Sequence, residues 1–165
     1  MKQHHVFSFL QRMGKSFMLP IAVLPVAGIF LGVGSSLTNE TTIMALHLDS
    51  VLGQGTFLYS VLILLKQVGK VLFDNLPLIF AVSIALGMSK RRKEVAALAA
   101  IIAFFVMHAT INTLLCLDGS IVNGVASNYV LDGSITSVCG MLSLEMGVFG
   151  GIIVGLGVSL SLIHI

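Results

Sequence analysis

Charge, tryptophan and cysteine are all scarce in this sequence, and the scarcity of charge decides the class of protein. Charged residues make up 10% of the chain, against about 25% in an ordinary soluble domain, while 56% of the residues are hydrophobic. Tryptophan is absent, and the net charge of +2 is too small and too scattered for a protein that binds nucleic acid. The composition therefore indicates a membrane protein.

The cysteines and histidines give no sign of a cofactor or a metal. Cys116 and Cys139 form neither a metal-ligand spacing nor a disulfide framework. They flank a loop that we expect outside the membrane, so a disulfide and two free thiols both remain open. Four histidines lie at chain ends or in loops without ligand spacing: His4, His5, His47 and His164. No phosphate loop, Ser/His/Asp set or carboxylate pair is visible, so the residues themselves offer no catalytic site.

The first long uncharged stretch, residues 17–34, sets the orientation of the chain. As a helix it would be about 27 Å long, close to a hydrocarbon core of about 30 Å. Basic residues precede it at Lys2, Arg12 and Lys15, and none follows until Lys66. This asymmetry predicts a first transmembrane helix with a cytoplasmic N-terminus. A cleaved signal peptide is the alternative, which the later apolar segments disfavour.

The segment that follows decides the number of spans. If residues 51–65 crossed the membrane, the basic cluster at residues 90–93 would lie outside, against the positive-inside rule. We therefore expect residues 51–70 to lie along the outer surface as an amphipathic helix, and residues 71–89 to form the second span. The basic cluster is then a cytoplasmic turn, which we interpret as a topology signal rather than as a site for lipid headgroups or a partner.

Residues 94–115 predict a third span, which runs outward, and residues 147–165 a fourth, which returns. Both contain small residues at helical spacing, which let neighbouring backbones approach closely. These residues are Ala97, Ala99, Ala100 and Ala103 in the third span and Gly147, Gly151 and Gly155 in the fourth. For the glycines, flexibility without a packing partner is the alternative.

The two segments between these spans that we place outside, residues 37–50 and 117–143, carry acidic but no basic residues. The longer one has turn signals at Asp118-Gly119, Asn123-Gly124 and Asp132-Gly133. Its short runs at residues 127–131 and 134–138 predict a small hairpin. The predicted fold is thus all-α, a polytopic helical membrane protein with four transmembrane helices and one interfacial amphipathic helix.

Polar residues inside the predicted spans are the candidates for function, because such groups are costly in lipid and need a partner. His108, Thr110 and Asn112 lie in the outer half of the third span, and His108 and Asn112 share one helix face. A polar path for a substrate and hydrogen bonds between helices both explain them. Acidic and amide groups also precede predicted spans, where the helix dipole favours a helix-start role: Asp74, Asn75 and Glu145.

Four blocks of the sequence carry a family resemblance. GKSFMLPIAVLPVAGIFLGVG, residues 14–34, resembles the opening of the membrane subunit, enzyme IIC, of bacterial phosphotransferase sugar permeases in the glucose, maltose and N-acetylglucosamine branch. FDNLPLIFAVSIALG, residues 73–87, resembles that family's second span. VAALAA, residues 95–100, and GVFGGII, residues 147–153, are similar to its third and fourth spans. The similarity covers nearly all of residues 9–158.

The resemblance implies a sugar permease of the bacterial cytoplasmic membrane, in which a partner, enzyme IIB, phosphorylates the sugar on the inner side. It also implies a homodimer whose interface is built largely by this N-terminal half. The long outer loop favours a maltose-type or glucose-type member. The parent family is a protein phosphohistidine–sugar phosphotransferase.

The same resemblance implies that part of the family's domain is absent from this sequence. Family members are about twice as long or longer, and their histidine-bearing sugar loop and glutamate motif match no position here; His108 does not match the functional histidine. Residues 159–165 depart from the family, and we expect them to be non-native. Residues 1–165 are then expected to be an N-terminal scaffold and oligomerisation half, inactive by itself. The alternative is a self-contained four-helix membrane scaffold or interaction protein without transport activity.

Overall fold

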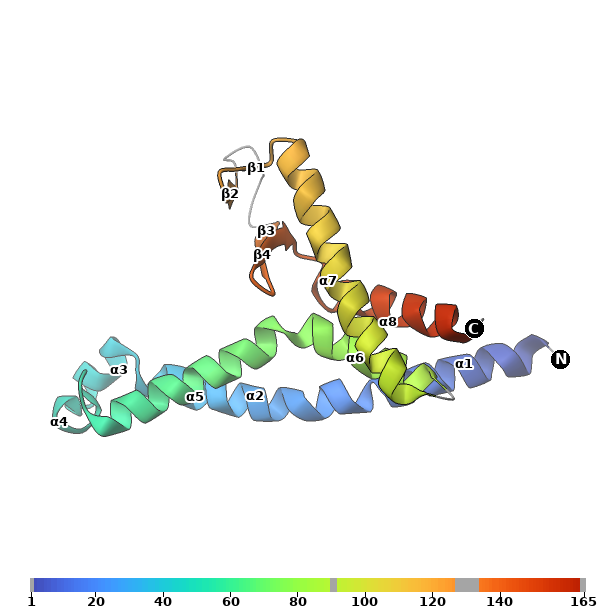
Figure 1. Cartoon of the computed structure of the whole chain (residues 1–165). Helices are drawn as coiled ribbons and strands as arrows, with labels where there is room; N and C mark the ends of the chain where they lie inside the picture. Colours follow the sequence, from blue (N-terminus) through green and yellow to red (C-terminus); the bar gives the residue numbers. More distant parts are fainter. Residues whose placement is uncertain (1, 90–91, 127–133, 164–165) are drawn as a thin grey trace. The chain divides into compact units, whose positions relative to one another are not determined.

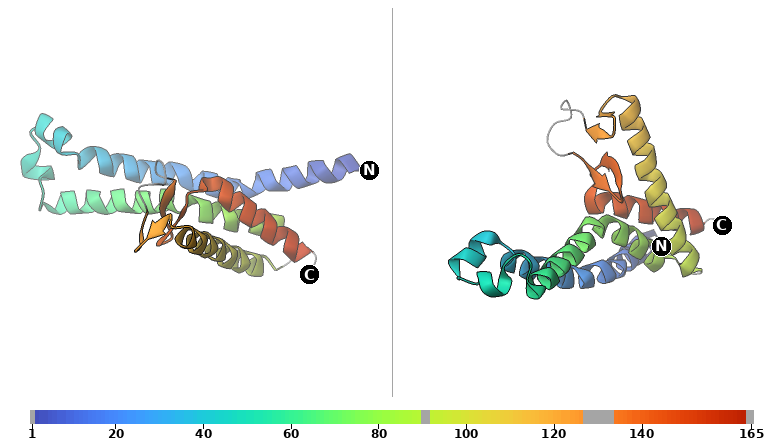
Figure 2. Two further views of the ribbon diagram at one scale, coloured as in Figure 1. Left: turned by 90° about the horizontal axis from the view of Figure 1, so that it is seen from above. Right: turned by 60° about the vertical axis from the view of Figure 1, so that its left-hand side comes forward.

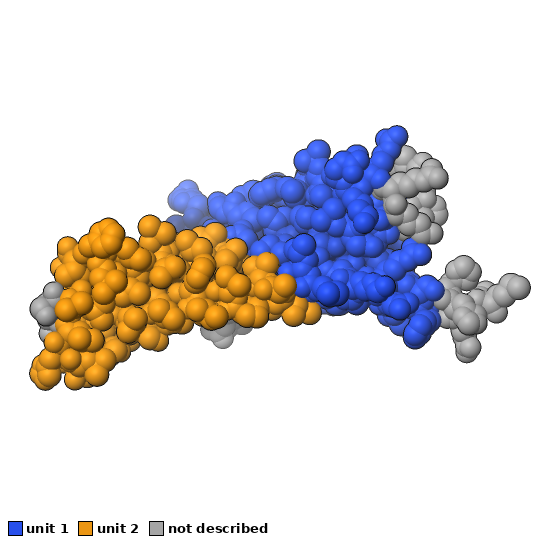
Figure 3. All heavy atoms as spheres, turned by 90° about the horizontal axis from the view of Figure 1, so that it is seen from below, with its two compact units in different colours: residues 1–20, 75–165 blue, residues 21–74 orange. Residues whose placement is uncertain are grey.

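The computed structural model describes residues 2–89, 92–126 and 134–163. The chain divides into two compact units, which Figure 3 colours separately. Unit 1 comprises Met1–Pro20 and Asn75–Ile165, and unit 2 comprises Ile21–Asp74. Helices dominate both units, in agreement with a helical membrane protein (Figure 1).

Unit 2 is built on two helices joined by a short helical tip. Helix α2 (Met18–Leu37) and helix α5 (Phe57–Asp74) lie side by side in each view of the chain (Figures 1 and 2). Helices α3 (Glu40–Ala45) and α4 (Asp49–Leu52) connect them. A small apolar core closes this tip, made by buried Ile43, Leu52 and Leu62 with Leu37, Leu48, Tyr59 and Leu65 against them.

Glycines let α2 and α5 approach closely. A Cβ atom added at Gly34 would lie 2.6 Å from the backbone nitrogen of Lys66. A Cβ atom added at Gly69 would lie 2.5 Å from the backbone nitrogen of Leu31 and 2.8 Å from the carbonyl oxygen of Ala27. Residue numbers fall along α2 as they rise along α5, so the two helices are antiparallel where they touch.

Unit 1 is organised around helix α6 (Leu76–Met88). Helix α1 (Lys2–Ser16), helix α7 (Lys93–Leu117) and helix α8 (Gly147–Ile163) all pack against it. Small side chains form the contact between α6 and α7, where Ala81, Ala85, Ala96 and Ala100 are fully buried. Of the alanines that the sequence predicted for close packing, Ala100 is therefore confirmed in the centre of the contact, and Ala103 packs at its margin.

The glycine face of α8 is confirmed at two of its three positions. Gly151 lies against the carbonyl group of Pro77, and a Cβ atom added at Gly155 would come within 2.7 Å of the carbonyl oxygen of Ala81. The partner is α6 of the same chain. Gly147 does not share this role, because it starts the helix with a φ of +53° and has no neighbour within 4 Å of an added Cβ atom.

Two β-hairpins follow α7. Strand β1 (Ile121–Val122) pairs with β2 (Val125–Ala126), and strand β3 (Ile135–Val138) pairs with β4 (Met141–Leu144). The predicted turn at Asn123-Gly124 is confirmed, with φ values of +53° and +74°. The run at residues 134–138 does form a strand, β3, but the hairpin observed is the one that β3 makes with β4, which the sequence did not predict. The predicted partner run at 127–131 and the turn at 132–133 lie outside the described residues.

The number of spans differs from the prediction. Two helices of the described chain are long and apolar enough to cross a membrane, Phe7–Leu37 and Lys93–Leu117, and the broken pair Phe57–Asp74 and Leu76–Met88 adds a third if it counts as one span. The predicted first span lies within Phe7–Leu37, and the predicted third span lies within Lys93–Leu117. Helix α8, with 17 residues, falls among the shorter apolar helices, so four spans are not confirmed.

The predicted boundary between an interfacial helix ending at residue 70 and a span starting at residue 71 is wrong. Helix α5 continues without a break to Asp74, and a new helix begins at Leu76. The cause is Pro77, which has no N–H to donate and occupies the first turn of α6, where a missing donor costs least. The break therefore falls at Asn75.

Candidate functional site

The polar residues predicted on one face of α7 meet the β3–β4 hairpin. The Nδ1 atom of His108 lies 2.7 Å from the Oγ atom of Ser143. One turn further along α7, the Nδ2 atom of Asn112 donates a hydrogen bond of 2.6 Å to the carbonyl oxygen of Leu142. Two side chains of α7 thus bind consecutive residues of strand β4. The face of α7 that carries both His108 and Asn112 is therefore in contact with the β3–β4 hairpin.

The His108 contact is closed to solvent. His108 is 2% exposed and Ser143 is fully buried. The ring of Phe104 meets the imidazole edge-on, with 4.6 Å between the ring centroids. Phe104 itself belongs to the apolar cluster that includes Ala81 and Val154. The histidine therefore sits at the border between this apolar cluster and the hairpin.

A histidine within hydrogen-bonding distance of a serine has the geometry of a base and a nucleophile, but the surroundings do not support catalysis. A triad-like site needs a third group that orients the base, and no carboxylate among the described residues contacts the His108 ring. The serine has no exposed surface to meet a substrate. The arrangement can hold the hairpin on α7, and its chemistry is that of a structural hydrogen bond.

A second polar contact joins the turn of the same hairpin to the start of α6. The Sγ atom of Cys139 donates to the Oδ1 atom of Asn75 over 3.6 Å, and burial raises the pKa of the Cys139 thiol. Cys139 and Gly140 form the two-residue turn, with φ values of +50° and +85°. Such a turn favours Asn, Asp or Gly at both positions, so the cysteine occupies a backbone conformation that most residues avoid.

The two cysteines, whose pairing the sequence left open, are both free. Cys116 is exposed near the end of α7, with its Sγ atom 4.0 Å from the Oδ1 atom of Asn112. Cys139 is half-buried. In the described part of the chain, no group of three or more His, Cys, Asp or Glu residues is placed to hold a metal ion.

The other candidates do not gather into a site. Thr110 is exposed and donates to the carbonyl oxygen of Val106 in its own helix, at 2.8 Å, so it does not continue a polar path from His108. Asn75 occupies the position before α6, as predicted, but its side chain makes no capping hydrogen bond. Glu145 is exposed shortly before α8, and its backbone N–H donates to the carbonyl oxygen of Ser134 at 2.9 Å.

The helix-start role expected for Asp74 is wrong. Asp74 is the last residue of α5, and its carboxylate lies 3.5 Å from the Nζ atom of Lys70, four residues earlier. Both side chains are more than half exposed, so this ion pair contributes at most about 1 kcal/mol. A carboxylate at the C-terminal end of a helix is not stabilised by the helix dipole, so the stabilising charge near Asp74 is that of Lys70.

Sequence reasoning missed the serines that carry the buried contacts of unit 1. The Oγ atom of Ser143 is hydrogen-bonded to His108, and the Oγ atom of Ser83 in α6 donates to the carbonyl oxygen of Ser16 in α1. Each of these serines has apolar neighbours in the sequence, which indicates that it is buried. A buried hydroxyl group needs a hydrogen-bond partner, and this is the signal that could have identified both serines. Within the described residues, every buried side-chain nitrogen or oxygen has such a partner.

Comparison with known proteins agrees with the resemblance read from the four sequence blocks. Residues 14–162 match the family described as "Phosphotransferase system, EIIC". Over 150 residues the chain is 39% identical to the PTS system glucose-specific EIICBA component of Staphylococcus saprophyticus, a match that covers 91% of this chain and 20% of that protein. The chain thus spans about a fifth of the length of this curated relative. The chain belongs to the EIIC family of the phosphotransferase system.

Proposed function

We propose that this chain is the N-terminal scaffold half of the permease domain of a phosphoenolpyruvate-dependent sugar transporter of the glucose type. The observation that carries the proposal is the family match over residues 14–162, which includes helices of both units. The sequence alone left maltose and glucose open, and the name of the glucose-specific relative favours glucose.

The geometry supports a scaffold role for this segment. Its close contacts are made by small residues between helices and by buried hydrogen bonds that hold a hairpin on α7. Phosphoryl transfer needs charged groups placed at the reacting oxygen atoms, and the buried polar side chains of the described residues are already paired in structural hydrogen bonds. We therefore assign sugar binding to residues beyond this segment, and phosphorylation to a partner enzyme IIB on the cytoplasmic side.

The proposal places the chain in the bacterial cytoplasmic membrane with its N-terminus inside and four passages across the bilayer. These are Phe7–Leu37, the broken pair α5–α6, α7 and α8. At 17 residues α8 is about 26 Å long, close to the hydrocarbon thickness of about 30 Å. The antiparallel packing of α5 along α2 supports a passage that includes α5, in place of the interfacial helix predicted at residues 51–70.

The distribution of charge within unit 1 supports this orientation. Arg12, Lys15 and Lys93 lie at one end of the unit, and Asp118 follows the opposite end of α7. Basic residues concentrate on the cytoplasmic side of membrane proteins, so the end with Lys93 is placed inside.

A homodimer is part of the proposal and rests on the family resemblance. The small-residue faces of the third and fourth predicted spans are used within unit 1, since Gly151 and Gly155 contact α6 and Ala100 is buried against it. The dimer is therefore expected to use other surfaces, such as the exposed apolar side chains of α5, which include Phe57 and Leu64.

A chimera tests the proposal. Residues 14–162 would replace the matching segment of the Staphylococcus saprophyticus glucose-specific component, and glucose phosphorylation would be measured in membrane vesicles with phosphoenolpyruvate and the soluble phosphotransferase proteins. We expect the chimera to phosphorylate glucose and the isolated chain to be inactive. Maltose serves as the competing substrate.

A chimera that inserts into the membrane at normal levels but phosphorylates neither sugar would contradict the proposal. Uptake that follows an ion gradient and ignores phosphoenolpyruvate would contradict it as well. Sugar transport by the isolated chain would show that the binding residues lie within this segment after all.

A further inference from the structure

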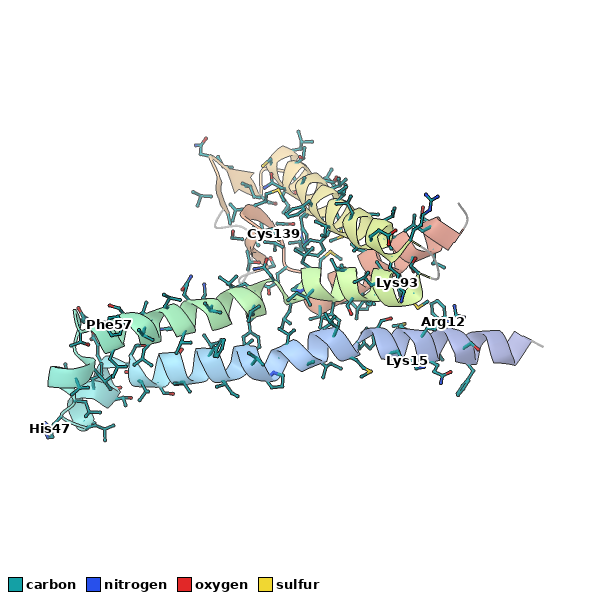
Figure 4. The ribbon with its side chains drawn as sticks, turned by 60° about the horizontal axis from the view of Figure 1, so that its bottom comes forward. Arg12, Lys15, His47, Phe57, Lys93 and Cys139 are labelled. Atoms are coloured by element: carbon teal, nitrogen blue, oxygen red, sulfur yellow. The ribbon has the colours of Figure 1, made fainter. Side chains whose placement is uncertain are left out.

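Basic residues from two distant parts of the sequence gather at one end of unit 1. Arg12 and Lys15 belong to α1, Lys93 opens α7 and Arg92 precedes it. Figure 4 shows Arg12, Lys15 and Lys93 at the same end of the unit. All four side chains are exposed. We call these four residues the basic surface.

The packing of α1 on α6 brings the two parts together. Ser16, which follows Lys15, lies against Gly87 near the end of α6, and its carbonyl oxygen accepts a hydrogen bond from Ser83. The rings of Phe17 and Phe80 add a contact with 5.7 Å between centroids. Ser89, which caps the end of α6, is three residues from Arg92, so their Cα atoms are at most about 11 Å apart.

The basic surface is not neutralised by the rest of the described chain. The ion pair found among the described residues is Lys70–Asp74 in unit 2, and none of the four cations takes part in one. Glu94, in the first turn of α7, is an exposed acid close to them, but the cations outnumber it. The surface therefore has charge available for an external anion.

Exposed apolar side chains lie close to these cations in the sequence. Leu10 belongs to α1, Leu19 follows Lys15 in the first turn of α2, and Val95 and Leu98 follow Lys93 in α7. These apolar residues belong to the segments Phe7–Leu37 and Lys93–Leu117 that are long and apolar enough to cross a membrane, so the cations lie where the passages meet the membrane surface. Phospholipid phosphates are at that level and acyl chains are beside the apolar groups, so an anionic phospholipid matches both features.

We propose that the basic surface binds the phosphate-bearing headgroups of anionic phospholipids in the cytoplasmic leaflet. Arg92 and Lys93 belong to the cluster that the sequence indicated only as a topology signal, and the position of Arg12 and Lys15 at the same end of unit 1 is the reason to revise that interpretation. The inference goes beyond the proposed function, because it concerns neither the sugar nor the phosphorylating partner. The lipid would link α1 to the start of α7 and hold that end of unit 1 at the headgroup level.

Lipid selectivity in vesicles tests the proposal. The chain is reconstituted in vesicles of phosphatidylcholine with phosphatidylglycerol, and spin-labelled forms of each lipid report the fraction that is motionally restricted by the protein. We expect a preference for phosphatidylglycerol that falls about fivefold or more in the quadruple variant R12Q/K15Q/R92Q/K93Q, since each cation near a membrane surface contributes roughly that factor. High salt should reduce the preference of the unchanged chain in the same direction.

Two matched variants separate this site from net charge. K66Q/K70Q removes cations from unit 2 and should keep the preference, as should the charge-conserving variant R12K/K15R/R92K/K93R. The proposal is overturned if the unchanged chain binds both lipids equally, or if K66Q/K70Q loses as much as the quadruple variant. If the quadruple variant does not insert into the vesicles, the salt dependence of the unchanged chain decides. A preference for phosphatidylglycerol that high salt does not reduce would overturn the proposal.

Competition with a soluble anion distinguishes the lipid from free phosphate. Inorganic phosphate at millimolar concentration should leave the restricted fraction of phosphatidylglycerol unchanged, because it supplies no acyl chains for Leu10, Leu19, Val95 and Leu98. Displacement of the lipid by inorganic phosphate would reassign the surface to a soluble phosphate ligand and overturn the lipid proposal.

Discussion

His108 of α7 and Ser143 of β4, 35 residues apart in the sequence, make a buried hydrogen bond of 2.7 Å between Nδ1 and Oγ. The antiparallel register of the hairpin, which pairs Thr136 with Ser143, fixes which side chains of β4 face α7. The bond therefore depends on the helix, the register and the turn together. It makes the hairpin part of unit 1 rather than a loose outer loop.

Replacement of Ser143 by alanine should destabilise the protein without removing a catalytic group. His108 Nδ1 would be left buried without its partner, which costs about 1–3 kcal/mol. The thermal unfolding midpoint in detergent should fall, while glucose phosphorylation by the chimera carrying S143A should persist. The control is Ser137→Ala, an exposed serine of the same hairpin, which should leave the midpoint unchanged. Loss of activity at an unchanged midpoint would instead identify Ser143 as a catalytic residue.

Replacement of Asn112 by alanine should loosen the hairpin from α7. The change removes the 2.6 Å hydrogen bond to the carbonyl oxygen of Leu142, worth about 1 kcal/mol, so local opening should increase about fivefold. Hydrogen exchange of the amides in residues 135–144 measures this. Thr113→Ala is the matched control, because Thr113 is exposed and its hydroxyl bonds only to Ala109 of its own helix. Equal exchange in the two variants would show that Asn112 does not hold the hairpin.

The sequence predicted what depends on hydropathy and spacing. The apolar stretches at residues 17–34 and 94–115, the turn at Asn123-Gly124 and the close-packing glycines Gly151 and Gly155 all follow from local pattern, and the structure confirms each of them. The shared face of His108 and Asn112 was also predictable, because four residues separate them on a helix.

What the sequence could not give depends on tertiary contacts. A spacing of four shows that His108 and Asn112 share a face, but only the fold shows that this face meets β4 rather than another helix or a substrate path. The break at Asn75 was misplaced because hydropathy does not change there, while Pro77 sets the start of α6 through its missing N–H. The approach of Arg12 and Lys15 to the start of α7 likewise required the packing of α1 on α6.

Alanine substitutions along α8 should separate packing glycines from free ones. A Cβ atom at Gly151 would collide with the carbonyl group of Pro77, and one at Gly155 would lie 2.7 Å from the carbonyl oxygen of Ala81, so both backbones would have to move apart. We expect G151A and G155A each to lower the free energy of unfolding by about 1–3 kcal/mol.

Gly157 provides the control in the same helix. A Cβ atom there has nothing within 4 Å, so G157A should be neutral or should stabilise the helix by up to about 1 kcal/mol. Urea or thermal unfolding in detergent, followed by the loss of helical signal, compares the three variants. Similar behaviour of G151A and G157A would show that α8 does not pack on α6 through this face.

The two free cysteines report the proposed orientation without any engineered label. Cys116 is exposed at the end of α7 that we place outside, so a membrane-impermeant maleimide added to whole cells should label it rapidly. Cys139 is half-buried and burial raises its pKa, so less of it is in the reactive thiolate form at neutral pH and its labelling should be slower. Because the pKa is raised, the rate at Cys139 should keep rising above about pH 8.5, where an ordinary thiol levels off.

Loss of the rapid labelling phase in the variant C116S would assign that phase to Cys116. The double variant C116S/K93C reports on the other end of α7, because Lys93 is exposed at the end that we place inside. K93C should react with the impermeant reagent only after the membrane is permeabilised. Rapid labelling of K93C in intact cells, together with labelling of Cys116 in the unchanged chain only after permeabilisation, would reverse the orientation of α7. The cytoplasmic position of the N-terminus would then be wrong as well, since Arg12 and Lys15 lie at the same end of unit 1 as Lys93.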